Sequence, residues 1–140
     1  KLNMYKKISA IQGVEDMEDI KNELLDRFGE IPTVTENLLS VALIKSLAHG
    51  SFVSEVSGGR KEFKIIMWNR APVDGYKLNM FLHKNSSEYH FTAERASYFT
   101  YKPAKVPKDI PQLITCLGKA FNDIKETFTE EKEAGARLLD

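Results

Sequence analysis

The sequence predicts an α+β domain with N-terminal helices, an antiparallel sheet made of two strand pairs, and a C-terminal helix packed on the sheet. Apolar residues recur at three- and four-residue steps through residues 1–50, which is the period of an amphipathic helix. Between residues 52 and 101 the pattern changes to short β-prone runs separated by turn residues. Helical spacing then returns in a long apolar stripe over residues 113–128. This order of elements favours an antiparallel sheet covered by helices on one face.

The first two expected helices cover residues 1–11 and 15–29. In the opening helix apolar residues step by three, and the pattern ends at about Ser9 or Ile11. The second helix begins near Glu15, among acidic residues that suit a helix N-terminus. Gly29 offers the left-handed backbone that commonly closes a helix, and Pro32 prevents simple continuation. The residues expected to share the apolar face of this helix are Met17, Ile20, Leu24, Leu25 and Phe28.

A third helix is expected from Thr33 to His49-Gly50. Thr33 and Glu36 have the spacing of a capping box, in which each side chain accepts a hydrogen bond from the other residue's backbone. The helix is broadly apolar, with Leu38, Val41, Ala42, Ile44, Leu47 and Ala48.

The first expected strand pair joins residues 52–57 to Phe63–Trp68. Residues 52–57 alternate in the way a half-buried strand does, and Phe63–Trp68 is a compact β-prone run. Gly58-Gly59 is a hairpin-turn signal between the two runs. A loop is expected over residues 69–75, because this segment holds Pro72 and Asp74-Gly75.

The remaining elements are a segment that is either a helix or a strand, a second strand pair and a final helix. Residues 76–84 are ambiguous, because Leu78, Phe81 and Leu82 fit a short helix while a strand is the alternative. Residues 88–93 and 96–101 are rich in aromatic residues, which favours two more strands. Asp109 is the expected cap of the last helix, with Pro111 in its first turn.

Length and composition indicate one domain with a hydrophobic core. Of the 140 residues 42% are hydrophobic, and we expect a single domain over residues 1–128. Residues 129–140 are charged and lack a sustained apolar stripe, so a frayed tail is expected there. The chain has 20 basic and 20 acidic residues, and this zero net charge argues against a dedicated nucleic-acid module. No apolar run approaches the ~20 residues that span a membrane, and a lone cysteine suits the reducing cytoplasm.

We expect no catalytic, cofactor-binding or metal-binding site in this chain. Gly58-Gly59-Arg60-Lys61 is the nearest approach to a phosphate-binding loop, but it lacks the required spacing and lies between two strands. His49, His83 and His90 are widely separated and lack metal-ligand spacing. Cys116 has apolar neighbours at helical spacing and no nearby histidine, so we interpret it as a small buried hydrophobe. An active site assembled from residues distant in sequence remains an open alternative.

A second alternative is a nucleic-acid-binding accessory domain that uses an aromatic and basic face of the sheet. Bases stack on aromatic side chains, and basic residues contact the phosphates. The competing interpretation is that the aromatic side chains form the core of the sheet and the lysines lie in solvent. The residues that could form such a face are Trp68, Tyr89, Phe91, Tyr98 and Tyr101, with Lys64, Arg70, Lys84, Arg95, Lys102 and Lys105.

A cluster of charges, Glu23, Asp26 and Arg27, points away from most of the apolar stripe of the second helix. One interpretation is a solvated face with an ion pair between Glu23 and Arg27, whose i,i+4 order is the favoured one. The other is contact with a complementary partner, where paired charges give specificity more than affinity. The fold alone does not require this pattern.

The segment over residues 23–32, ELLDRFGEIP, resembles the Asp-Arg-Phe-Gly-x-x-Pro signature of the C-terminal domain of bacterial transcription-repair coupling factors. The resemblance extends upstream through Leu2 and Tyr5, and downstream through the leucine-rich third helix. Beyond the first third of the chain only the order of elements matches. The pattern at Lys1 is already helical, as in a piece of a longer protein, and processing of a shorter one is the competing explanation.

The resemblance implies a regulatory role without catalysis. In the family, the parent protein is an ATP-driven DNA translocase that removes stalled RNA polymerase from double-stranded DNA and recruits the excision-repair machinery. The C-terminal domain docks on the N-terminal domain of the same protein and covers the surface that binds the excinuclease protein UvrA. The docking contacts fall on a Glu-x-x-Asp-Arg pattern, which Glu23, Asp26 and Arg27 match. The resemblance thus implies an autoinhibitory interdomain interface at these three residues, with ATP bound only by the upstream motor.

Overall fold

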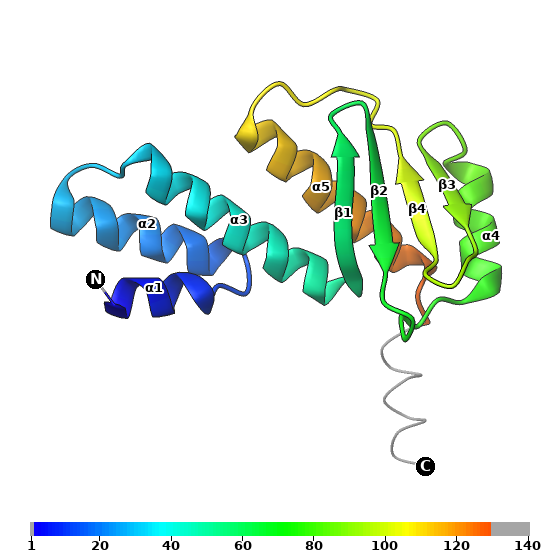
Figure 1. Cartoon of the computed structure of the whole chain (residues 1–140), viewed down its shortest axis with the longest axis horizontal. Coiled ribbons are helices and arrows are strands. Elements are labelled where there is room, and N and C mark those ends of the chain that lie inside the picture. The colour runs from blue at the N-terminus through cyan, green and yellow to red at the C-terminus, as the bar shows by residue number, and fades with distance from the viewer. Residues whose placement is uncertain (1, 130–140) are drawn as a thin grey trace, which may run out of the picture.

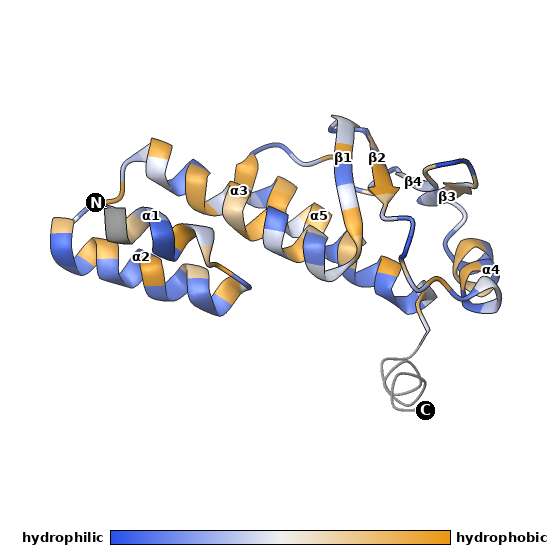
Figure 2. Ribbon diagram, turned by 60° about the horizontal axis from the view of Figure 1, so that its bottom comes forward, coloured by the Kyte–Doolittle hydropathy of each residue, from blue (hydrophilic) through white to orange (hydrophobic). Residues whose placement is uncertain are grey.

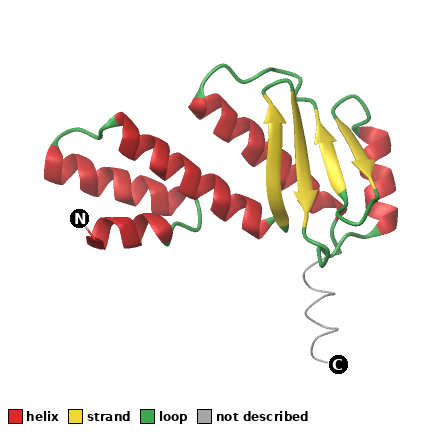
Figure 3. Cartoon of the chain, viewed as in Figure 1, coloured by secondary structure: helices red, strands yellow, loops and turns green. Residues whose placement is uncertain are grey.

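The computed structural model describes residues 2–129, which form five α-helices, a short 3₁₀ helix and one four-stranded sheet (Figure 1). Figure 3 shows that the strands lie together in one sheet, while α1, α2 and α3 precede the first strand in the chain. The α+β fold predicted from the sequence is therefore confirmed. The elements are α1 (Leu2–Ser9), α2 (Val14–Phe28), α3 (Thr33–Gly50), β1 (Val53–Gly59), β2 (Glu62–Met67), α4 (Gly75–Lys84), β3 (Tyr89–Thr92), β4 (Tyr98–Tyr101), α5 (Ile110–Ile124) and the 3₁₀ helix η1 (Lys125–Thr127).

Helices α1 and α2 and the first half of α3 form a helical lobe that lies beside the sheet (Figure 1). Apolar residues at helical spacing give each helix one inward face. The buried residues of this lobe are Ile8, Ile11, Met17, Ile20, Leu24, Leu39 and Leu43. α2 ends as predicted, because Gly29 adopts the left-handed conformation at φ 75° and its N–H donates to the carbonyl of Leu25 at 2.8 Å.

The start of α3 corrects the expected capping box. Pro32, with φ −60° and ψ 147°, occupies the capping position, and no side chain caps the helix. The proline ring already fixes the extended backbone from which the helix begins, so Thr33 becomes the first helical residue instead of the cap. Glu36 therefore lies one position too far along the helix for the reciprocal bond, and its N–H donates to the carbonyl of Pro32 at 3.0 Å.

The four strands are antiparallel in the order β1-β2-β4-β3, and the two predicted strand pairs meet through β2 and β4. The hairpin turn between β1 and β2 is shifted by two residues from the predicted Gly58-Gly59. Both glycines belong to β1, Gly59 pairs with Glu62, and Arg60-Lys61 forms the turn. Gly58 has φ 106°, and a Cβ at this residue would lie 2.5 Å from the carbonyl oxygen of Glu62. Glycine is thus required by the close approach of the two strands.

Residues 76–84, for which the sequence left helix or strand undecided, belong to helix α4. Asp74 caps it, because its carboxylate accepts hydrogen bonds from the backbone N–H groups of Tyr76 and Lys77. The predicted cap of α5 is also present, since Asp109 accepts from the N–H of Gln112. α5 ends at Ile124, and η1 follows from Lys125.

One face of the sheet is covered by α5 and α4, and the other face is open (Figures 1 and 2). Alternate strand residues point into the covered face and form a second hydrophobic core. Its buried residues include Phe63, Ile65, Met67, Phe81, Tyr89, Phe99, Tyr101, Leu117 and Phe121. Leu47 of α3 packs against this sheet core and against the core of the helical lobe, so α3 connects the two. Figure 2 also shows that α3 is more apolar along its length than α2.

The described chain ends beside the loop before α4. Phe128 forms an isolated antiparallel bridge with Val73, and the N–H of Thr129 donates to the carbonyl of Pro72 at 2.8 Å. Apart from Thr129, the predicted tail over residues 129–140 lies outside the described residues. Within residues 2–129 none of the helices combines the length and the apolar character that crossing a membrane requires.

Candidate functional site

The candidate site lies on the last two turns of α2, at the end of the helical lobe away from the sheet (Figure 1). Leu24 points into the lobe core, while Asp26 and Arg27 are exposed and Glu23 is partly exposed. The side chains of Asp26 and Arg27 form no hydrogen bond or ion pair with any residue in the described range 2–129. The charged face predicted from the sequence is therefore present, with two of its three charges free to meet a partner.

Glu23 already has a partner within the domain. Its Oε1 accepts a hydrogen bond from Nζ of Lys7 in α1 at 2.7 Å, so the ion pair joins α1 to α2. The expected i,i+4 pair with Arg27 does not form, because Lys7 takes the carboxylate, and Arg27 contributes only a longer-range attraction. Oε2 of Glu23 is inaccessible to solvent and has no hydrogen-bond donor among the described residues.

The hydrogen bond from Lys7 lowers the pKa of Glu23, and the positive charges of Lys7 and Arg27 add to this effect against an opposing desolvation. A carboxylate with a lowered pKa stabilises the fold above the ordinary glutamate pKa of about 4.3, and this stability is lost as pH falls through the folded-state pKa. We expect wild type to lose more thermal stability than Glu23→Gln between about pH 5 and 3. Thermal denaturation across this range measures the difference, and parallel curves for the two proteins would contradict the assignment.

A hollow of about 1080 Å³ lies beside the charged face, between α1, α2 and the start of α3. Glu23 and Arg27 line it, whereas Asp26 does not. Phe28 also lines it and is 68% exposed, and Leu25 is 46% exposed, so these two residues of the predicted apolar face are not buried with Met17, Ile20 and Leu24. Leu24 is the last buried residue of α2, so the final turn of the helix extends past the lobe core. The apolar residues that line the hollow are Met4, Tyr5, Ile8, Leu24, Phe28, Pro32, Val34 and Leu38.

Comparison with known proteins adds an independent finding on the same part of the chain. The family described as the TRCF domain matches residues 1–78, which contain the whole helical lobe and the first strand pair. The chain belongs to the TRCF domain family. The resemblance seen at residues 23–32 is thereby confirmed.

Curated relatives of this TRCF domain are transcription-repair-coupling factors. That of Haemophilus influenzae is 30% identical over 91 residues, covering 65% of this chain and 8% of the relative. That of Escherichia coli K12 is 33% identical over 61 residues, covering 44% of this chain and 5% of the relative. The chain thus spans less than a tenth of the length of these relatives.

A solved structure supports the fold of the TRCF domain. The crystal structure of the C-terminal domain of a transcription-repair coupling factor superposes with a TM-score of 0.65. The match covers 90% of this chain and 81% of that chain at 24% sequence identity. The shared architecture therefore extends over the second half of the TRCF domain, where the sequence showed only a common order of elements.

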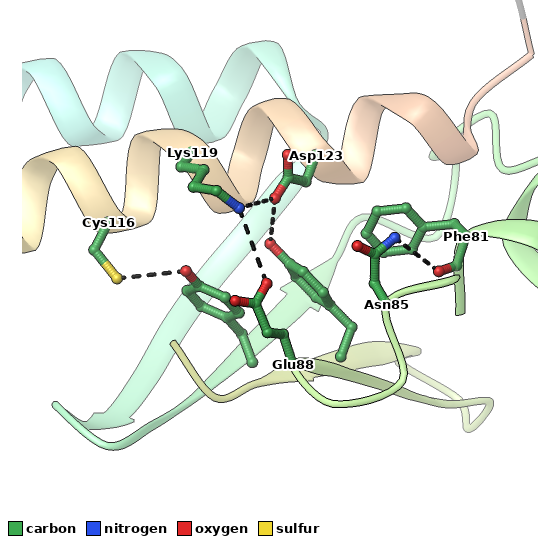
Figure 4. Close-up of polar contacts among 8 residues, drawn as sticks. Phe81, Asn85, Glu88, Cys116, Lys119 and Asp123 are labelled. Atoms are coloured by element: carbon green, nitrogen blue, oxygen red, sulfur yellow. Dashed lines mark hydrogen bonds and ion pairs between the residues drawn. The ribbon is translucent and has the colours of Figure 1, made fainter. Parts of the chain in front are cut away.

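A polar cluster lies between the sheet and α5 (Figure 4). The hydroxyl of Tyr89 donates to Asp123 at 2.9 Å, and Lys119 bridges Asp123 at 2.8 Å and Glu88 at 3.9 Å. Burial and the hydrogen bond to Asp123 raise the pKa of Tyr89, so this hydroxyl stays protonated. Cys116 is only partly buried, and its thiol contacts the hydroxyl of Tyr101 at 3.6 Å.

The aromatic residues proposed to bind nucleic acid do not share one face of the sheet. Tyr89 and Tyr101 are buried in the covered face, and Phe91 packs against the same core. Tyr98 points to the open face, where the ammonium of Lys64 lies 4.2 Å from its ring centre, and Trp68 is exposed. Within residues 2–129, no group of three His, Cys, Asp or Glu side chains is placed to hold a metal ion.

Proposed function

We propose that this TRCF domain is the C-terminal regulatory domain, over residues 1–128, of a longer transcription-repair coupling factor. In this proposal it docks on the N-terminal domain of the same protein and masks the surface that binds the excinuclease protein UvrA. The observation that carries the proposal is the exposed charged face of α2, where Asp26 and Arg27 have no partner among the described residues. The domain itself is proposed to be non-catalytic, and the motor that binds ATP lies elsewhere in the longer protein.

The geometry suits reversible docking. Asp26 and Arg27 carry opposite charges on adjacent residues, so a partner surface must present matching charges in one register. Interfaces between domains of one chain are commonly more polar than permanent ones, and coupling free energies between sites are about 1–3 kcal/mol. A contact of this strength holds the masked state and still releases it when the parent protein, acting in the cytoplasm on double-stranded DNA, engages stalled RNA polymerase.

The test removes the two free charges in the full-length factor. We expect the double variant Asp26→Ala/Arg27→Ala to bind UvrA about fivefold more tightly or better, because the closed state loses its charge contacts. Calorimetric titration with purified UvrA measures the change. The melting temperature should stay near that of wild type, since both side chains are exposed.

The matched control is Glu94→Ala/Arg95→Ala, a second exposed acid and arginine pair, located in the turn between β3 and β4. This variant should leave the affinity for UvrA unchanged. If the α2 variant also leaves it unchanged, the docking role of Asp26 and Arg27 is excluded.

Nucleic-acid binding through the sheet is the weaker candidate, because Tyr89, Phe91 and Tyr101 face the core.

A further inference from the structure

The end of the sheet at which β1 turns into β2 carries a surplus of positive charge. The turn consists of Arg60-Lys61, and the loop between β4 and α5 passes beside it (Figure 1). The register brings the turn and the loop together, because Phe63 of β2 pairs with Tyr101, the last residue of β4. We call this surface the basic end. Its cations, all of them exposed, are Arg60, Lys61, Lys102, Lys105 and Lys108.

The acidic groups around the basic end are already engaged. Oε1 of Glu62 lies 3.6 Å from Nζ of Lys102, and Asp109 caps α5. Glu88 accepts a hydrogen bond from the N–H of Lys102 on its carbonyl, while its carboxylate lies 3.9 Å from Nζ of Lys119. Residues 60–62 and 102–109 hold five basic and two acidic side chains, which leaves a surplus of three positive charges. Since the chain as a whole is neutral, this surplus is balanced elsewhere in it.

Four cations of the basic end have no partner within the described residues 2–129. Lys102 is the exception, through its contact with Glu62. Glu55 and Lys64, further along the first two strands, are one acid and one base and leave the surplus unchanged. The other cations are therefore available to a negatively charged partner. The side chains that form no hydrogen bond or ion pair with residues 2–129 are those of Arg60, Lys61, Lys105 and Lys108.

The loop that carries three of these lysines is held against the fold. Pro103 and Pro107 are buried, whereas Lys102, Lys105 and Lys108 are exposed. The proline rings fix φ at two positions, so the loop loses less conformational entropy when a partner orders it. Six residues of extended chain span at most about 20 Å, so the three lysines form a short row. A row of cations on a restrained loop suits a long polyanion better than a small anion.

A double-helical nucleic acid is the polyanion that fits the basic end best. It presents one negative charge per ~1.7 Å of its axis, whereas an acidic peptide presents at most one per ~3.3 Å of extended chain. Each cation that meets a phosphate releases a condensed counterion, which favours binding. A single strand binds largely by stacking its bases on exposed aromatic rings, but Phe63 and Tyr101, the rings at this end, are buried.

We propose that the basic end binds the phosphate backbone of a nucleic-acid duplex without sequence preference, because contacts to phosphate carry no sequence information. The contact needs no exposed aromatic ring, so it differs from base stacking on the sheet. It is also separate from the docking of Asp26 and Arg27, which lie on α2 at the far end of the helical lobe. Neither proposal depends on the other.

The test is a titration of the 140-residue chain into a fluorescently labelled DNA duplex of about 20 base pairs, followed by anisotropy. With five phosphate contacts, the logarithm of the affinity should fall with the logarithm of the salt concentration with a slope of about −4.5. Binding should therefore weaken about 500-fold between about 50 and about 200 mM salt. An RNA duplex of the same sequence, titrated in parallel, identifies which of the two helices is preferred.

Lys105→Glu/Lys108→Glu should weaken duplex binding about tenfold or more at the lower salt concentration and flatten the salt dependence. The matched control is Lys6→Glu/Lys45→Glu, two exposed lysines on α1 and α3, which changes the net charge by the same amount. The control should alter the affinity by less than about twofold, because screening by salt confines the effect to nearby charges. Both variants should keep the melting temperature of wild type, since all four side chains are exposed.

Three results contradict this assignment. The first is no change of anisotropy at low salt with either duplex, although the melting temperature shows a folded chain. The second is an equal loss of affinity in the two double variants, which would mean that only net charge matters. The third is binding of an oligoglutamate or of a single strand as tight as that of the duplexes, which would identify an acidic protein segment or an unpaired strand as the partner.

Discussion

Phe99→Ala is expected to lower the free energy of unfolding by about 3–5 kcal/mol, a large part of the stability of a domain this size. Phe99 is fully buried in β4, at the centre of the sheet core. Its ring centre lies 4.9 Å from that of Phe91 and 6.4 Å from those of Phe81 and Tyr89. Removing the ring opens a cavity that β4, paired on both sides, cannot close. Urea denaturation followed by circular dichroism measures the loss.

The neighbouring residue provides the control. Tyr98 points to the open face of the sheet and contacts the ammonium of Lys64. Tyr98→Ala removes a ring of similar size from the same strand, yet it should cost only about 1 kcal/mol because the face is solvated. Equal losses for Phe99→Ala and Tyr98→Ala would show that the sheet does not have one covered and one open face.

The sheet and the last helix were predictable because their signals are local. Alternation and β-prone composition mark the strands, and Asp109 and Pro111 mark the start of α5. Residues 76–84 stayed ambiguous because a short apolar segment fits both periods, and the cap at Asp74 decides for a helix. The turn at Arg60-Lys61 was missed because Gly58 is needed inside β1 rather than between the strands.

The candidate site was only partly predictable for a different reason. Helical spacing shows that Glu23, Asp26 and Arg27 lie near one another on α2, but it does not show what lies opposite each side chain. The partner of Glu23 is Lys7, 16 residues earlier, which no i,i+4 rule identifies. The exposure of Phe28 depends on where the lobe core ends, and that is a tertiary property.

Leu39→Ala is expected to cost about 3–5 kcal/mol as well, although Leu39 is far from the sheet core. Leu39 is fully buried among the residues of the helical lobe. The two cores share contacts, because Leu47 packs against both and Ile114 of α5 packs against the lobe core. We therefore expect the whole chain to unfold in one transition.

The single tryptophan makes this testable, because Trp68 lies beside the sheet and reports on it, whereas helical circular dichroism reports on the lobe helices together with α4 and α5. In Leu39→Ala both signals should shift to the same lower urea midpoint. A shift of the helical signal alone would show that the lobe unfolds independently. Leu39→Ala would then disrupt docking by unfolding α2 and α3, whereas Asp26→Ala/Arg27→Ala removes only the charge contacts from a folded lobe. Comparing the urea midpoints of the two variants separates loss of the docking surface from loss of its chemistry.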